Sequence, residues 1–373
     1  MDKVKHFIDC WDYSAEELLA MAELIIQLKK DAKKGCCPKL LENQSLGMIF
    51  NGNSTRTRVS FEVAATQLGG HALYLTGGEE GELHLGKRET IADTARVVSS
   101  MVDGIVMRWR PTDEMEEFIK ACSVPFFNGM DHTRHPTQTL CDFVTILENL
   151  PDGKKLKDIT LSFIGSTGVR ETSANDLAKL LPRFGANVIL CSPDEYELGG
   201  ANDKNPQWMI DKNKECRAIA IAEGHGTVTL LRDPAEAVRK SDYVYTGCFC
   251  YEGTESKSDF EIYYRDFIDK GYQVTEELLS VNPNAMTMHY LPALRGKEMT
   301  DYAMDYKKSL LWKQAENRLH TQRGLMAYLM APLRPDFKKN GSTEEEERTK
   351  RIILQMREKF GMEYTHKTKY VHE

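Results

Sequence analysis

The feature that most constrains the fold is a repeated alternation of short apolar runs with longer helical patterns. Residues 104–108 and 159–165 are typical of these runs, which have the length and apolar content of buried strands. Strands that alternate with helices form parallel sheets, because each return to a parallel strand needs a crossover connection. The sequence therefore predicts an α/β protein, with strands over residues 46–50, 71–76, 104–108, 124–129, 159–165, 187–191, 227–231, 243–246 and 285–288.

A turn-forming segment, Pro151-Asp152-Gly153, interrupts this alternation. We therefore expect two domains, each a parallel sheet flanked by helices, over residues 1–150 and 151–316. A last helical pattern begins near Ser342 with acidic residues in its first turn, as the helix dipole favours. We expect the helices of residues 317–373 to return to the first domain, and a solvated tail is the alternative for the last helix.

The composition narrows the classes of function. A net charge of −7 argues against a surface for nucleic acids. No run approaches the ~18 apolar residues that a membrane span needs. The nine cysteines are odd in number and scattered, which is typical of reduced thiols in the cytoplasm. Because the chain has neither a Gly-x-Gly-x-x-Gly turn after a strand nor a Walker loop, we expect no nucleotide cofactor.

The stretch from Ser54 to Arg58 joins a predicted strand to a predicted helix and has the composition of an anion site. The first turn of a helix has unpaired N–H groups and a positive dipole end. Ser54, Thr55 and Thr57 add hydroxyl donors there. The guanidinium groups of Arg56 and Arg58 can each bind a phosphate through two hydrogen bonds. The alternative is an ordinary hydroxyl N-cap with two solvated arginines.

Further polar residues follow the ends of other predicted strands, where ligands bind in parallel sheets. Arg108, His135 and Gln138 can all donate to a carbonyl oxygen, and His289 follows the last strand. A site that binds phosphate and polarises a neighbouring carbonyl suits acyl-phosphate chemistry through a stabilised oxyanion. His132 and His135 have the spacing of metal ligands, but no carboxylates at fitting positions accompany them. We therefore expect no metal.

Several motifs resemble those of the aspartate/ornithine carbamoyltransferase family, most closely its ornithine and putrescine branch. The resemblance extends over roughly residues 10–331, and residues 89–96 and 316–321 also fit the family. Its strongest motifs are Ser54-Thr55-Arg56-Thr57-Arg58, His135-Pro136-Thr137-Gln138 and His289-Tyr290-Leu291-Pro292.

The resemblance implies a role for each residue of the first substrate's site. The phosphate of carbamoyl phosphate would be held by Ser54, Thr55, Arg56 and Thr57. The carbonyl oxygen, or its bridge to the phosphate, would be bound by Arg108, His135 and Gln138. Arg318 would close on the same substrate from the second domain. The backbone carbonyl of Leu291 would receive the carbamoyl amino group and the attacking amine. The reaction that the resemblance implies needs neither a cofactor nor a covalent enzyme intermediate.

The residues expected around the second substrate, an amine, depart from the family pattern. Tyr290 replaces the cysteine of the ornithine branch, and Gly247 stands where that branch has an acidic residue. Tyr290 is either a wall that shortens the pocket or a hydroxyl that binds the acceptor, and a packed wall is favoured. The expected amine-binding residues are Lys87, Val169, Arg170, Gly247, His289, Tyr290, Leu291 and Pro292.

The resemblance also implies how the chain assembles. Family members are trimers with sites at subunit junctions, and Lys87 matches a loop lysine that the aspartate branch lends to the neighbouring subunit. The alternative is that Lys87 and Arg170 are solvated loop charges.

These features together favour carbamoyl transfer from carbamoyl phosphate to a small amine other than ornithine, by a cytoplasmic homotrimer. The alternatives are a true putrescine or ornithine carbamoyltransferase, and a non-catalytic paralogue that binds carbamoyl phosphate.

Overall fold

The computed structural model describes residues 4–78, 81, 83–169, 171–203, 205–249, 257–333 and 342–362, with backbone alone at residues 257–260. The chain forms two compact units. Unit 1 contains Met1–Val144 and Asn317–Glu373, and unit 2 contains Thr145–Glu316. The chain passes from one unit to the other within two helices, α5 (Pro136–Glu148) and α12 (Leu311–Met330).

Unit 1 is built on a parallel four-stranded sheet, as the alternating pattern predicted. The strand order is β2-β1-β3-β4, so β2 and β4 form its edges. The central strands read as continuous apolar runs because both faces of the sheet are covered, and Ile105, Val106 and Met107 have no exposed surface. The strands are β1 (Ser45–Phe50), β2 (His71–Thr76), β3 (Gly104–Arg108) and β4 (Phe126–Met130).

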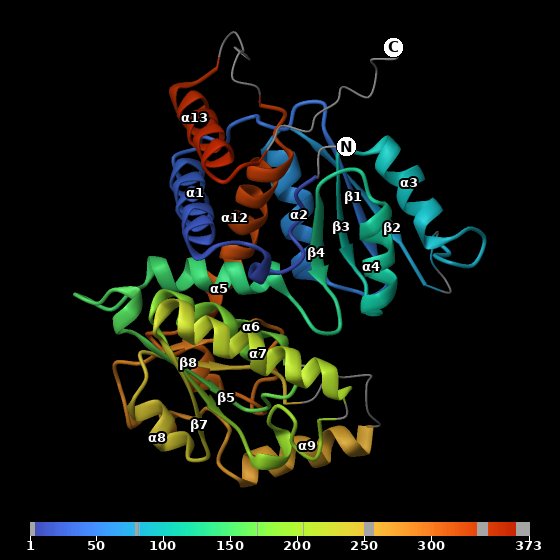
Figure 1. The fold of residues 1–373 in the computed structure, drawn as a ribbon. Helices are drawn as coiled ribbons and strands as arrows, with labels where there is room; N and C mark the ends of the chain where they lie inside the picture. Colours follow the sequence, from blue (N-terminus) through green and yellow to red (C-terminus); the bar gives the residue numbers. More distant parts are fainter. Residues whose placement is uncertain are drawn as a thin grey trace, which may run out of the picture. The chain divides into compact units, whose positions relative to one another are not determined.

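Helices cover the sheet of unit 1 (Figure 1). Their apolar faces supply a core around the sheet in which Met115 and Phe118 are fully buried. Besides α5 and α12, the helices of unit 1 are α1 (Ala15–Lys33), α2 (Thr55–Gln67), α3 (Ile91–Met101), α4 (Thr112–Ala121) and α13 (Glu344–Lys359).

The last helix, α13, returns to unit 1, as expected for the C-terminal segment. It lies beside α1, at the opposite end of the sequence (Figure 1). Arg348 Nη2 lies 2.5 Å from Asp31 Oδ2, and Ile353 is fully buried. The hydroxyl of Thr343 caps the helix by accepting a hydrogen bond from the N–H of Glu346. The described part of α13 is therefore a docked helix rather than a solvated tail.

Unit 2 contains a second parallel sheet, with five strands in the order β7-β6-β5-β8-β9. An apolar cluster that includes Ile164, Val244 and Phe267 packs against it. The strands are β5 (Thr160–Ile164), β6 (Asn187–Cys191), β7 (Thr227–Leu231), β8 (Tyr243–Thr246) and β9 (Met286–Met288). The helices are α6 (Thr172–Leu180), α7 (Gln207–Gly224), α8 (Pro234–Arg239), α9 (Lys257–Asp269), α10 (Glu276–Ser280) and α11 (Asp301–Met304). Short 3-10 helices cover Cys10–Asp12, Leu156–Asp158, Leu181–Phe184 and Asp194–Tyr196.

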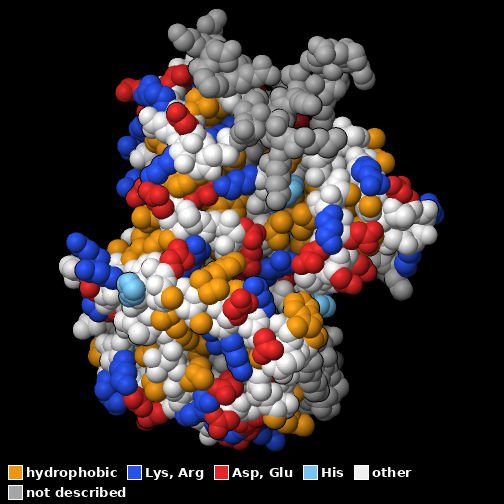
Figure 2. All heavy atoms as spheres, in the orientation of Figure 1, with side chains coloured by type: hydrophobic (Ala, Val, Ile, Leu, Met, Phe, Trp, Pro, Cys, Tyr) orange, Lys and Arg blue, Asp and Glu red, His pale blue; other side chains and the backbone are white. Residues whose placement is uncertain are grey.

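The surface carries charges of both signs. On the face drawn in Figure 2, the side chains of Lys and Arg lie intermixed with those of Asp and Glu. None of the helices in the described ranges is both long enough and apolar enough to cross a membrane.

Candidate functional site

The turn between β1 and α2 leaves the helix N-terminus open to an anion. Ser54 occupies the N-cap position in an extended conformation, and its hydroxyl makes no capping hydrogen bond. The first turn of α2 contains no acidic residue that would neutralise the dipole. The geometry therefore differs from an ordinary hydroxyl cap and leaves N–H groups pointing out of the helix end.

The two arginines of this turn have different surroundings. Arg56 is half-buried. The side chain of Arg58 is 47% exposed, its Nε lies 3.5 Å from Glu62 Oε2, and its guanidinium stacks 3.7 Å from the ring centre of Tyr74. Arg58 is thus engaged on the outer surface of α2, and its part in an anion site stays a prediction. Residues two positions apart on a helix point in different directions, so the two arginines have different surroundings.

A buried chain of hydrogen bonds joins three of the predicted residues within unit 1. Arg318 donates from Nη1 to Gln138 Oε1 at 2.6 Å and from Nη2 to Thr57 Oγ1 at 3.1 Å. Gln138 in turn donates from Nε2 to Asp142 Oδ1 at 2.7 Å. Asp142 was missed by the sequence reasoning, although its i, i+4 spacing from Gln138 on a helix is a usable signal.

Arg318 therefore belongs to unit 1. The expectation that it acts from the second domain is wrong, because α12 enters unit 1 at Asn317, one residue before it.

His135 lies close enough to three arginines of this unit for their charges to act on it. Burial lowers its pKa well below the ordinary value, and the nearby charges of Arg318, Arg108 and Arg56 lower it further. Arg108 also donates from Nη1 to the carbonyl of Gly129 at 3.3 Å. The structure thus brings the predicted residues together around a neutral imidazole. His132, by contrast, is exposed.

In unit 2, Tyr290 fills a space that Gly247 leaves empty. A Cβ atom added at Gly247 would lie 2.5 Å from both Cε1 and Oη of Tyr290, closer than real contacts allow. The Tyr290 hydroxyl donates to Glu171 Oε2 at 3.1 Å and accepts a hydrogen bond from the N–H of Cys248 at 2.8 Å. The hydroxyl is therefore engaged on both sides, an arrangement that favours the wall over the acceptor-binding hydroxyl.

Glu171 is a site residue that the sequence reasoning did not single out. It ends the loop after β5, occupies the N-cap position of α6 and is only 2% exposed. Burial raises its pKa to about 8, although the hydrogen bond from Tyr290 and the N–H groups of Ser173 and Ala174 act to lower it. Its place after a parallel strand was a usable signal, since that is where ligands bind.

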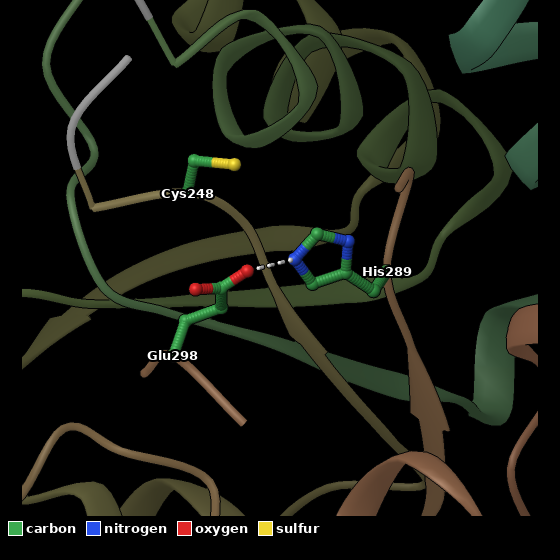
Figure 3. Close-up of side chains that lie close together, drawn as sticks. All are labelled: Cys248, His289 and Glu298. Atoms are coloured by element: carbon green, nitrogen blue, oxygen red, sulfur yellow. Dashed lines mark hydrogen bonds and ion pairs between the residues drawn. The ribbon is translucent and has the colours of Figure 1, made fainter. Parts of the chain in front are cut away.

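Cys248, His289 and Glu298 gather their ligand atoms within 4.8 Å of one another, as metal ligands do (Figure 3). However, His289 Nδ1 accepts a hydrogen bond from the N–H of Leu291 at 2.8 Å. A neutral imidazole then carries its proton on Nε2, which lies 3.2 Å from Glu298 Oε1 and donates to it. Burial also raises the pKa of Cys248 to about 12. The group is therefore better explained as a hydrogen-bonded support than as a metal site.

This support holds the turn that follows β9. Leu291 has a φ of 55° and is joined to Pro292 by a cis peptide bond. Glu298 Oε1 also accepts from the N–H of Leu294 at 2.7 Å. The backbone at Leu291, whose carbonyl the family resemblance assigns to the substrate amine, is thereby held through His289.

Two further predicted residues have their own surroundings. Val169 is a core residue that packs against Leu198 and Ile210. Lys87 is exposed in the turn before α3. Arg170 lies outside the described residues.

Comparison with known proteins defines the class to which this fold and these residues belong. Residues 5–148 match the model of the aspartate/ornithine carbamoyltransferase carbamoyl-P binding domain, and residues 157–329 match that of the Asp/Orn binding domain. This chain is a member of the aspartate/ornithine carbamoyltransferase family.

Individual relatives belong to two branches of the family. A putrescine carbamoyltransferase of Mycoplasma mycoides is 38% identical, covering 89% of this chain and 88% of its own length. An ornithine carbamoyltransferase of Archaeoglobus fulgidus is 39% identical, covering 88% and 98%. Among solved structures, ornithine carbamoyltransferase from Pyrococcus furiosus has a TM-score of 0.75 and 36% identity, covering 90% of this chain and 100% of its own.

Proposed function

We propose that this protein transfers the carbamoyl group of carbamoyl phosphate to the nitrogen of a small amine, giving a ureido product and phosphate. The observation that carries the proposal is the buried chain Thr57–Arg318–Gln138, beside a neutral His135 that faces the charges of three arginines. The family relatives named putrescine and ornithine carbamoyltransferase support the same reaction.

Within unit 1, the open N-terminus of α2 suits the phosphate. Ser54, Thr55 and Thr57 supply hydroxyl donors, and Arg56 supplies a guanidinium with the geometry for a bidentate contact. Arg318 already bonds to Thr57, so an anion there would gain a second cation without a large rearrangement.

The carbonyl oxygen of carbamoyl phosphate suits Arg108, His135 and Gln138. An imidazole that is neutral at physiological pH still donates one N–H, and it does so without the cost of burying another positive charge. The amine attacks the carbonyl carbon to form a C–N bond. The C–O bond to phosphate then breaks, and the departing phosphate takes the proton from nitrogen, which leaves atoms and charge balanced.

On the amine side, we propose Lys87, Arg170, Gly247, His289, Tyr290, Leu291 and Pro292. Val169, which the resemblance also implies, has its side chain packed in the core of unit 2. The acceptor is shorter or flatter than ornithine, since Tyr290 fills the space above Gly247. The second candidate is ordinary putrescine or ornithine transfer, which the names of the relatives favour.

A homotrimer in the cytoplasm completes the proposal. Val59 and Val63 on α2 and Leu73 on the edge strand β2 are 52%, 37% and 41% exposed, an apolar surface suited to another copy of the chain. If Lys87 acts in a neighbour's site, mixing Arg56→Ala chains with Lys87→Ala chains should restore activity that each lacks alone. Light scattering gives the mass, and a monomer, or no recovery after proven subunit exchange, contradicts this assembly.

The deciding experiment is a colorimetric ureido assay with carbamoyl phosphate and a panel of amines that includes L-ornithine, putrescine and short mono-amines. We expect product with at least one short amine. Product with L-ornithine at ordinary efficiency supports the second candidate instead. Binding of carbamoyl phosphate with no product from any amine supports a non-catalytic paralogue.

A further inference from the structure

Three residues from three separate segments of unit 2 meet around the Tyr290 side chain. Glu171 precedes α6, Gly247 follows β8, and Tyr290 follows β9. Parallel strands bring the residues after their C-terminal ends to one edge of the sheet, and β5, β8 and β9 are neighbours in that sheet. We call Glu171, Gly247 and Tyr290 the acceptor wall.

Tyr290 and position 247 compete for the same space. The ring of Tyr290 occupies the volume in which a side chain at position 247 would begin, 2.5 Å from the ideal Cβ position. The two residues therefore depend on each other, because a Cβ atom at position 247 would force the end of the Tyr290 side chain to shift. Loss of the family's acidic residue at this place and gain of the tyrosine are thus one structural change.

Two hydrogen bonds fix the orientation of the Tyr290 side chain. The single hydroxyl proton of Tyr290 is directed to Glu171 Oε2 at 3.1 Å, while its oxygen accepts from the N–H of Cys248 at 2.8 Å. The hydrogen bonds to Glu171 and from Cys248 together fix the position of the ring. Glu171 therefore acts on the pocket through Tyr290 and need not touch the substrate.

The acceptor wall has no exposed carboxylate. Gly247 has no carboxyl group, and Glu171 does not supply an exposed one in its place. Glu171 is only 2% exposed and accepts the hydrogen bond from Tyr290. Its other oxygen, Oε1, is buried and meets no hydrogen-bond partner of good geometry among the residues that the structure describes. A raised pKa, to about 8, is consistent with a carboxyl group that stays protonated there. A second ammonium group on the acceptor would find no free carboxylate at this wall.

We propose that the acceptor wall sets the specificity of the reaction, with Glu171 as the positioning residue of Tyr290, and that it selects a compact amine with no second ammonium group. This inference rests on the proposed carbamoyl transfer and names the class of its acceptor.

The first experiment tests the wall without relying on turnover. Gly247→Ala should lower the midpoint of thermal unfolding in the native background and should have little effect in a Tyr290→Cys background, where the space is free. Equal losses in both backgrounds would overturn the contact between the two residues.

The second experiment measures kcat/KM for n-propylamine, putrescine and L-ornithine with the native protein and with Tyr290→Cys, Tyr290→Phe, Glu171→Gln and Glu171→Ala. Tyr290→Cys should raise the ratio of putrescine or L-ornithine to n-propylamine by about tenfold or more. Glu171→Ala should shift the ratio in the same direction. Glu171→Gln keeps an oxygen for the Tyr290 hydroxyl and should retain the native ratio, which a general loss of stability would not do.

Tyr290→Phe covers the case in which Glu171→Ala does not fold, because it removes the same hydrogen bond and keeps the ring. The inference would be overturned if the native protein used putrescine or L-ornithine as efficiently as the Tyr290→Cys variant does. An unchanged ratio in both Glu171→Ala and Tyr290→Phe would also overturn it. If no variant forms a ureido product with any amine, the proposed function itself fails and the acceptor class fails with it, whereas the unfolding experiment still decides whether the wall exists.

Discussion

The two units of the chain use their charged residues in opposite ways. Unit 1 gathers Arg56, Arg108 and Arg318 around His135 and keeps the imidazole neutral. Unit 2 buries an acid, Glu171, against the hydroxyl of a tyrosine. The first arrangement presents donors for an anionic, carbonyl-bearing substrate, and the second presents a neutral, packed surface.

The comparison shows which parts of the site changed together. Three of the predicted first-substrate residues, Thr57, Gln138 and Arg318, meet in one hydrogen-bonded chain. The second-substrate residues depart from the family pattern at positions 247 and 290, and the structure makes these departures mutually compatible. The residues predicted for the first substrate thus keep the family's residue types, whereas those predicted for the acceptor differ at two positions that fit each other.

The largest effect is expected when Arg56 of unit 1, which is proposed to bind the phosphate, is removed. Arg56→Ala should weaken carbamoyl phosphate binding by roughly 3–4 kcal/mol, because a desolvated phosphate loses a bidentate partner. The matched control is Arg58→Ala, two residues along the same helix, where an exposed and stacked guanidinium should contribute less than about 1 kcal/mol. Isothermal titration calorimetry measures both. Similar losses in the two variants would show that the arginines are not distinguished as the structure indicates.

The next effect concerns the carbonyl donors around His135. His135→Ala should lower kcat by about 10²-fold if it removes an oxyanion donor, with little change in stability. Because burial and three arginines lower its pKa well below the ordinary value, His135 is neutral at physiological pH. The pH–rate profile around neutral pH should therefore contain no step that disappears in His135→Ala. Full turnover in the purified variant would remove His135 from the mechanism.

A stability measurement tests the buried acid of unit 2. The pKa of Glu171 is raised from 4.5 to about 8, so the native state keeps its proton where the unfolded state releases it. The contribution is complete below pH 4.5 and is lost as pH rises toward about 8. Compared with Glu171→Gln, the native protein should lose up to about 1.4 kcal/mol of unfolding free energy per pH unit in that window. Urea titrations at several pH values measure the slope, and parallel curves for both proteins would mean an ionised Glu171.

The smallest effect is expected from metal removal. Dialysis against EDTA should leave turnover and stability unchanged, because the proton on His289 Nε2 is committed to Glu298. Elemental analysis of the dialysed and untreated protein provides the control. If the protein contained stoichiometric zinc and lost activity when the zinc was removed, Cys248, His289 and Glu298 would be a metal centre and not a hydrogen-bonded support.

Much of the fold could be predicted from the sequence because its signals are local. Apolar runs such as residues 104–108 and 243–246 mark strands that are buried on both faces, and both ranges coincide with observed strands. The predicted helix after Ser54 begins at Thr55, and the helix predicted after Ser342 begins at Glu344. Strand order was not predicted, since it depends on which crossovers pack side by side.

The site was predictable where one short segment contains the chemistry, and not where partners come from distant segments. The hydroxyls and arginines after β1 could be identified as an anion site, although the sequence could not tell that Arg58 turns outward onto Tyr74. Residues 317–373 were expected to return to the first domain, and Arg318 lies in that unit. Only the role implied by the family resemblance, action from the second domain, is wrong.

The sequence by itself determined the class of sheet, the segments that form it and the residue types at the strand ends. Only the tertiary structure decided that Gly247 and Tyr290 share one volume, and that Glu171 holds the tyrosine by its hydroxyl. The physical reason is the range of the interactions. Strand and helix signals arise between near neighbours in the chain, whereas steric exclusion, burial and the pKa of an acid depend on which distant segments the parallel sheet brings to one edge.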